Sequence, residues 1–128
     1  MTTAIVTEDS GWWIVARCNI DGVVADFTQA AVSSVTWKAW SVTDPATITN
    51  SGTETVSQVV FDTLQTTLGI PDSTGYNLRV KFAASEFDTP GRYRVEVLIS
   101  PASAEQFIVV DPETKQPPII EVLDVWTS

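Results

Sequence analysis

The strongest constraint on the fold is a two-residue alternation of apolar and polar side chains between residues 76 and 99. In residues 76–82 every second position is large and apolar, and Asn, Arg and Lys lie between them. After a link that ends in Pro90-Gly91, the same period returns in residues 93–99. This alternation is typical of β-strands with one buried and one solvated face. We therefore expect an antiparallel sheet that packs on a core from one side.

Other segments predict further short strands. Residues 12–20 are rich in aromatic and β-branched side chains and end at Asp21-Gly22, a strong turn signal. Residues 31–42 form the longest candidate strand, in which we expect Trp37 to face the core and Trp40 to face outward. Because Trp12 and Trp13 are neighbours on a strand, one of them must also face outward.

The remaining segments carry weaker patterns. Residues 46–49 and 53–60 predict the two sides of a turn-rich hairpin, and residues 105–110 predict the last strand of a sandwich. In residues 61–68 the apolar side chains are spaced three and four apart, and Asp62 stands where an acid stabilises a helix start. That segment predicts one or two helical turns.

Length and cysteine content limit the domain organisation. A chain of 128 residues can form one domain with its own core, and its one cysteine, Cys18, leaves no internal disulfide. We expect an all-β, Ig-like antiparallel β-sandwich of seven to nine strands with one short helical turn. Residues 1–11 are expected to be an N-terminal arm or edge strand, 12–111 the sandwich, and 112–128 a proline-interrupted C-terminal arm or extra strand.

Composition argues against several classes of function. The 7 basic and 16 acidic residues give a formal charge of −9, which opposes binding to a phosphate backbone. There is no histidine, so the commonest general base and zinc ligand are missing. Acidic residues such as Asp21 and Asp26 follow no catalytic or calcium-loop spacing, and turn chemistry explains them better. We expect a protein that is not an enzyme, with no catalytic residues, cofactor, metal or nucleic-acid partner.

The sequence also predicts where the protein resides. Residues 1–4 carry no signal-peptide features, and no apolar run approaches membrane-spanning length. We therefore expect no membrane partner and a protein kept or assembled in the cytosol. Four of the seven basic residues fall on the two alternating strands, which predicts one charged sheet face that is either solvated or paired by salt bridges with an acidic neighbour. These residues are Arg79, Lys81, Arg92 and Arg94.

One motif resembles a known family. Gly91-Arg92-Tyr93 matches the Gly-x-Tyr at the start of the F-like strand of Ig-type sandwiches, where the tyrosine hydroxyl closes a corner to nearby backbone. Together with residues 19–28, 59–66 and 75–77, the chain resembles small Ig-like structural proteins of tailed-bacteriophage virions. Its layout is similar to the N-terminal domain of the phage baseplate upper protein. The resemblance covers roughly residues 12 to 110.

The resemblance implies a non-enzymatic virion protein that is assembled in the host cytoplasm. One short Ig-like domain suits a capsid decoration or cement protein that binds the head surface, and this is the function we expect. The implied partners are the major capsid protein or other virion proteins, with a homo-oligomer or a symmetric array on the particle. A neck, tail or baseplate Ig-like module is the alternative within the virion. A carbohydrate-binding module that uses exposed tryptophans is the alternative from another class.

Apolar residues outside the expected core are candidates for contact with a partner. Prolines at 112, 117 and 118 separate residues 119–126 from the sandwich. We therefore expect this segment to dock on a neighbouring subunit or on the capsid protein, by adding to a sheet edge or by filling a groove. The alternative is that it folds back as an edge strand of its own domain. The candidate partner-binding residues are Trp40, Ile120, Val122 and Trp126. The candidate structural residues are Trp37, Tyr93 and Gly91.

Overall fold

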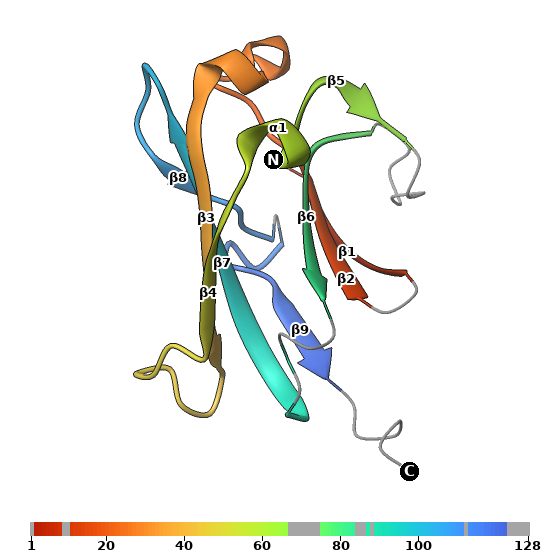
Figure 1. Cartoon of the computed structure of the whole chain (residues 1–128), viewed down its shortest axis with the longest axis vertical. Coiled ribbons are helices and arrows are strands. Elements are labelled where there is room, and N and C mark those ends of the chain that lie inside the picture. The colour runs from red at the N-terminus through yellow and green to blue at the C-terminus, as the bar shows by residue number, and fades with distance from the viewer. Residues whose placement is uncertain are drawn as a thin grey trace.

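The computed structural model describes residues 2–8, 11–66, 75–83, 87, 89–111 and 113–122. Over these residues the chain forms two antiparallel sheets that face each other (Figure 1). The first sheet has the order β1-β2-β6-β5, and its strands are β1 (Thr2–Glu8), β2 (Gly11–Arg17), β6 (Tyr76–Ala83) and β5 (Val60–Gln65). The second has the order β4-β3-β7-β8, with β9 also paired to β7, and its strands are β4 (Asn50–Glu54), β3 (Val32–Ser41), β7 (Gly91–Pro101), β8 (Phe107–Ile108) and β9 (Ile119–Val122). The predicted all-β sandwich is confirmed.

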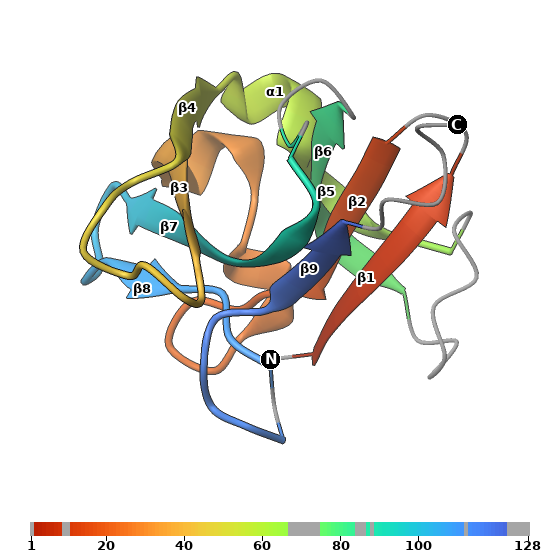
Figure 2. The ribbon, with the colours of Figure 1, turned by 90° about the horizontal axis from the view of Figure 1, so that it is seen from below.

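The strand order is that of an Ig-type sandwich. If the strands are lettered along the chain, β1, β2, β6 and β5 take the places of A, B, E and D, whereas β3, β7 and β8 take those of C, F and G. Strand β4 adds to the free side of β3, and Figure 2 shows β1 and β9 at the same side of the molecule. The predicted alternation of residues 76–99 therefore covers strands E and F, one from each sheet.

The core fills the space between the sheets. In β6, Leu78, Val80 and Phe82 are fully buried, as the alternation predicts. In β7, Val95 and Val97 face them from the other sheet and are equally buried. Short segments outside the sheets lie at one end of the sandwich (Figure 1). They are the 3-10 turns Val24–Asp26 and Gln29–Ala31 and the one-turn helix α1 (Val56–Val59).

Trp37 occupies the centre of this core, as predicted. Its indole is 5% exposed and meets the Phe82 ring edge-on, with 4.8 Å between ring centroids. Its Nε1 donates a hydrogen bond of 3.0 Å to Glu54 Oε1. Directly across the β3–β4 pair lies Gly52, where an added Cβ would come within 2.7 Å of Trp37 Nε1. The indole therefore fits because the neighbouring edge strand has no side chain at that position.

We expect Trp37→Ala to lower the free energy of unfolding by about 3–5 kcal/mol, because it leaves a large cavity between the sheets. The measurement is urea-induced unfolding of the variant and the wild type. Trp40→Ala, on the outer face of the same strand, is the matched control and should cost about 1 kcal/mol or less. Equal losses for the two variants would contradict the central role of Trp37.

Tyr93 closes the predicted corner at the start of β7. Its hydroxyl donates a hydrogen bond of 2.7 Å to the Thr89 carbonyl, four residues upstream, and the residue is 5% exposed. Gly91, between them, adopts φ of 150°, a backbone conformation that favours glycine. The motif that carries the family resemblance therefore makes the tyrosine corner known from Ig-type sandwiches.

Replacing Tyr93 by Phe removes this hydrogen bond and leaves the ring in place. We expect the free energy of unfolding to fall by about 1 kcal/mol or somewhat more, the usual loss for one buried hydrogen bond. The midpoint of thermal unfolding reports the change. A variant with an unchanged midpoint would show that the corner contributes nothing to stability.

Two local predictions are wrong. Residues 61–66 are not helical, because Val60–Gln65 is strand β5, and the helical turn lies just before it. The spacing of three and four was misleading because Val60 alone faces the core, while Phe61 faces outward and Leu64 is 41% exposed. Likewise, residues 46–49 form no strand, β4 is Asn50–Glu54, and Val56–Val59 within the predicted second side of the hairpin is the helix α1. Residues 67 and 68 lie outside the described part.

Candidate functional site

The described part of the C-terminal segment folds back onto its own domain. Strand β9 pairs with residues 91–94 of β7, and Ile120, opposite Tyr93, is 1% exposed. Val122 is half-buried against the same core. The expectation that Ile120 and Val122 dock on another subunit is therefore wrong, and the alternative of an edge strand is correct. Trp126 lies outside the described residues.

Proline carbonyls explain this outcome. The prolines at 117 and 118 lack N–H groups, which suggested a break in the sheet. Their carbonyl oxygens still accept hydrogen bonds: Arg94 Nη1 donates to the Pro117 oxygen over 2.7 Å, and Val95 N–H donates to the Pro118 oxygen over 2.9 Å. The prolines therefore lead the chain along β7 and into β9 instead of separating the two.

We expect Ile120→Ala to lower the free energy of unfolding by about 2–5 kcal/mol, as for other buried isoleucines. Glu121→Ala, one residue further and exposed, is the matched control and should change it by about 0.5 kcal/mol or less. Chemical unfolding of both variants measures the difference. If Ile120→Ala left stability unchanged but impaired association with a partner, β9 would have to be released in the working protein.

Trp40 lies on the outer face of the second sheet, as predicted. The indole is half-buried, and Lys38 Nζ lies 6.0 Å from its ring centroid. Lys38 also pairs with Glu96 at 3.5 Å, while Arg94 stands opposite Trp40 in the β3–β7 register. This arrangement suits an interface anchor, and the partner-binding role of Trp40 stays a prediction.

Trp13 marks a second outer face; the sequence predicts that Trp12 or Trp13 faces outward but not which of the two. Trp12 packs against the core, so Trp13 is the member of the pair that faces outward. The Arg79 guanidinium lies 4.6 Å from the Trp13 ring centroid and 5.1 Å from that of Phe61, and Lys81 Nζ lies 5.0 Å from Trp13. Within the described chain, Trp13 Nε1 and Arg79 Nε are buried without a hydrogen-bond partner. The adjacent tryptophans were the signal for this face.

The predicted single charged face is wrong. Arg79 and Lys81 lie on β6 of the first sheet, whereas Arg92 and Arg94 lie on β7 of the second. Because side chains outside the core point away from the opposite sheet, the two pairs lie on opposite sides of the sandwich. Trp13 and Trp40 are separated in the same way, and do not combine into one stacking platform for a sugar chain.

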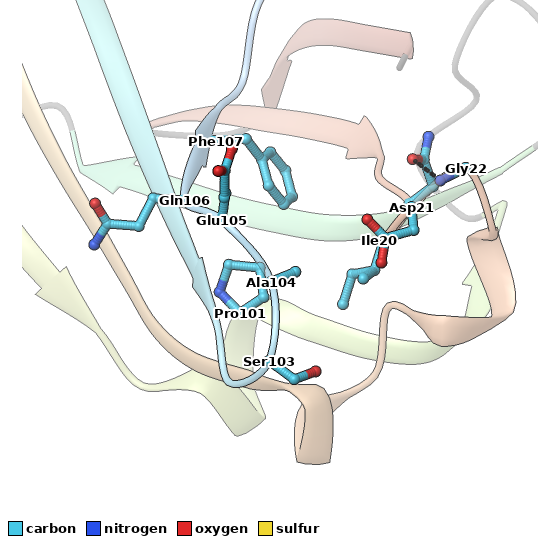
Figure 3. A pocket seen from close by; sticks show the side chains of 10 residues that line it. Ile20, Asp21, Gly22, Pro101, Ser103, Ala104, Glu105, Gln106 and Phe107 are labelled. Atoms are coloured by element: carbon cyan, nitrogen blue, oxygen red, sulfur yellow. Dashed lines mark hydrogen bonds between the residues drawn. The ribbon is translucent and has the colours of Figure 1, made fainter.

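A pocket of about 660 Å³ opens at one end of the sandwich (Figure 3). One wall is the turn at residues 19–22, and the other is the connection from the end of β7 to β8. Sequence reasoning identified the turn but not the pocket, because its two walls are far apart in the chain. The lining residues are Asn19, Ile20, Asp21, Gly22, Pro101, Ser103, Ala104, Glu105, Gln106 and Phe107. We call this the loop-end pocket.

Hydrogen bonds fix the first wall of the loop-end pocket. Ile20 and Val23 exchange backbone hydrogen bonds of 3.1 and 2.9 Å, and the two residues between them, Asp21 and Gly22, have φ of 52° and 83°. Positive φ at both central residues is the signature of a type I′ turn, which favours Asp-Gly. Asn19 Oδ1 accepts the Gly22 N–H over 3.1 Å and closes the turn further.

The second wall is fixed as well. The N–H of Ala102 donates to the Ala31 carbonyl over 2.9 Å, which ties the connection to the 3-10 turn before β3. Phe107 pairs with Ile99 in the sheet, and its ring lies 6.4 Å from that of the buried Phe27. Both walls are therefore tied to neighbouring parts of the fold by hydrogen bonds and packing.

The one cysteine has a structural environment. Burial raises the pKa of the Cys18 thiol from 9.0 to about 12, so the thiolate is negligible near neutral pH. The Asn77 side chain accepts the Cys18 N–H over 2.7 Å and donates to its carbonyl over 2.9 Å, bridging β6 to the end of β2. In the described ranges, no group of three His, Cys, Asp or Glu residues is placed to hold a metal ion. No described helix is long and apolar enough to span a membrane.

Comparison of the chain with protein-family models, curated proteins and solved structures finds no match. The functional argument therefore depends on the surfaces of the molecule itself. Two outer faces each present a tryptophan beside basic side chains, and one end carries the loop-end pocket with two carboxylates. Aromatic residues and arginines are enriched at protein interfaces, so these features are typical of a binding module.

Proposed function

We propose that the protein is a non-enzymatic structural component of a tailed-bacteriophage virion, and that it decorates or cements the capsid by binding the head surface. The observation that supports this proposal is the corner formed by Gly91 and Tyr93. These residues belong to the motifs on which the resemblance to Ig-like virion proteins rests, and the hydrogen bond from Tyr93 to the Thr89 carbonyl is the tyrosine corner of Ig-type sandwiches. The Ig-type strand order extends that support to the whole domain.

The physical properties of the domain suit adhesion to a large assembly. A sandwich with a buried aromatic core presents its surface residues on rigid strands, which lowers the entropy cost of binding. Half-buried Trp13 and Trp40 stand beside cations, a combination common among residues that dominate binding free energies. The formal charge of −9 keeps free copies apart before assembly.

Two other functions make different demands. A neck, tail or baseplate module would use the same fold and the same kinds of contact, so only its copy number and location on the particle distinguish it. A carbohydrate-binding module would need exposed tryptophans on one surface, but Trp13 and Trp40 lie on opposite sheets. The structure favours the protein-binding alternatives for this reason.

The test is the copy number of the chain in purified particles of the phage that encodes it. We expect quantitative mass spectrometry to find it at a ratio to the major capsid protein that matches the number of capsomers, because a decoration protein occupies each equivalent site. A copy number that matches the symmetry of the tail would favour the tail or baseplate module instead. Absence from particles that survive washing in moderate salt would contradict a virion role.

A further inference from the structure

We propose that the loop-end pocket binds a lysine or arginine side chain of a partner protein, presented in a short segment that also carries an apolar residue. The proposal deepens the proposed function, because it gives the chemistry of a contact with the capsid. Its evidence is the shape, lining and charge of the pocket, all of which lie in the described residues.

The volume of the pocket fits several side chains. At about 660 Å³ it lies in the range of roughly 300–1,000 Å³ found for ligand sites. One arginine or lysine alone would fill only a fraction of that space. A peptide segment of two or three residues is therefore a better match than a single inserted side chain.

The lining has an apolar part that suits aliphatic groups. Ile20 is 9% exposed and Pro101 is buried, and the half-buried ring of Phe107 stands on the side opposite Ile20 (Figure 3). The methylene stem of a lysine or arginine packs well on such a surface while its charged head stays at the rim. A cation beside the Phe107 ring would gain a further attraction from the face of the ring.

The charge of the lining selects a cation. Asp21 is on one wall and Glu105 on the other, and both are exposed (Figure 3). None of the ten lining residues is a lysine or arginine, and neither carboxylate has an ion-pair partner in the described structure. An incoming cation would meet two unpaired carboxylates, and the charge of −9 on the whole chain would also attract a basic partner.

The pocket needs little rearrangement to bind. The type I′ turn at Asp21-Gly22 and the hydrogen bond from Ala102 to Ala31 hold both walls, so few groups lose freedom when a ligand enters. The pocket is lined by the turn after β2 and by the connection after β7, whose residues Asp21, Gly22 and Glu105 are exposed and therefore accessible to a protein surface. These features favour a loop of a partner protein over a free small amine, which would leave the apolar part of the pocket uncovered.

The test is an NMR titration of the full-length, ¹⁵N-labelled protein with the capped peptide Ac-Leu-Arg-Leu-NH2. We expect saturable shifts at the amides of Gly22, Glu105 and Phe107, with a millimolar dissociation constant. The peptide Ac-Leu-Gln-Leu-NH2, which has the same apolar groups without the charge, should bind about tenfold more weakly or not at all. Equal binding of the two peptides, or no saturable shift with either, would overturn the proposal.

Charge-removing variants give the matched control. Asp21→Asn/Glu105→Gln should weaken binding of the arginine peptide about tenfold or more, and the turn should survive because Asn-Gly also favours type I′. Asp44→Asn/Glu113→Gln removes two negative charges at exposed sites outside the pocket and should leave the affinity within about twofold. Equal weakening in both variants would mean that net charge, not the pocket, attracts the peptide.

Two further comparisons distinguish a small amine from a partner protein as the ligand, and failure of the pocket from failure of the virion role. Putrescine that binds as tightly as the arginine peptide at the same amides would overturn the assignment to a partner protein in favour of a small amine. If the chain is absent from particles but the pocket binds the peptide selectively, the proposed virion role fails and the pocket stands. If the chain is present in particles but the peptide does not bind, the pocket fails and the virion role stands.

Discussion

Aromatic packing between the two sheets is the interaction on which the rest of the structure depends. The Trp37 ring contacts Phe82 of the other sheet and Phe87 of the connecting segment, and Phe87 in turn contacts Trp12 and Tyr93. These rings lie 4.8 to 6.4 Å apart by their centroids, and they link strands β2, β3, β6 and β7. Antibody domains join strands B and F of the two sheets by a disulfide, but this chain has one cysteine. The aromatic cluster therefore takes over the role of joining the sheets.

Sequence-based prediction was most accurate where many residues shared one pattern. Alternation over many positions predicted β6 and β7 well, since a shift of one residue would expose the whole apolar set. Residues 61–68 have too few apolar positions to separate a helix from an edge strand. The paired prolines before β9 were misread because missing N–H groups were counted and available carbonyls were not. The loop-end pocket could not be predicted from the sequence, because its two walls are far apart in the chain and meet only through tertiary packing.

Contacts already present limit what each outer face can offer a partner. Lys38 is paired with Glu96, and Arg94 donates to the Pro117 carbonyl. Arg79 stacks between the rings of Trp13 and Phe61. A partner that binds these cations must weaken such contacts or add to them in the geometry they already have. The outer faces therefore favour flat, aromatic contact, in which a rigid side chain covers a large area at low entropic cost.

The loop-end pocket differs from the two outer faces because its two carboxylates form no ion pair within the described residues. Asp21 and Glu105 lie on the two walls with no ion-pair partner among the described residues, and because both are exposed the free protein leaves them hydrated at little cost. A cation that enters between them displaces this water while its stem covers Phe107 and Ile20. The binding free energy then has an electrostatic and a hydrophobic part, and within the described residues no ion pair of Asp21 or Glu105 has to break. Among the surfaces described, this end of the sandwich is the one where a basic protein surface would meet carboxylates that have no ion-pair partner in the described part of the chain, which favours fast and specific association with such a surface.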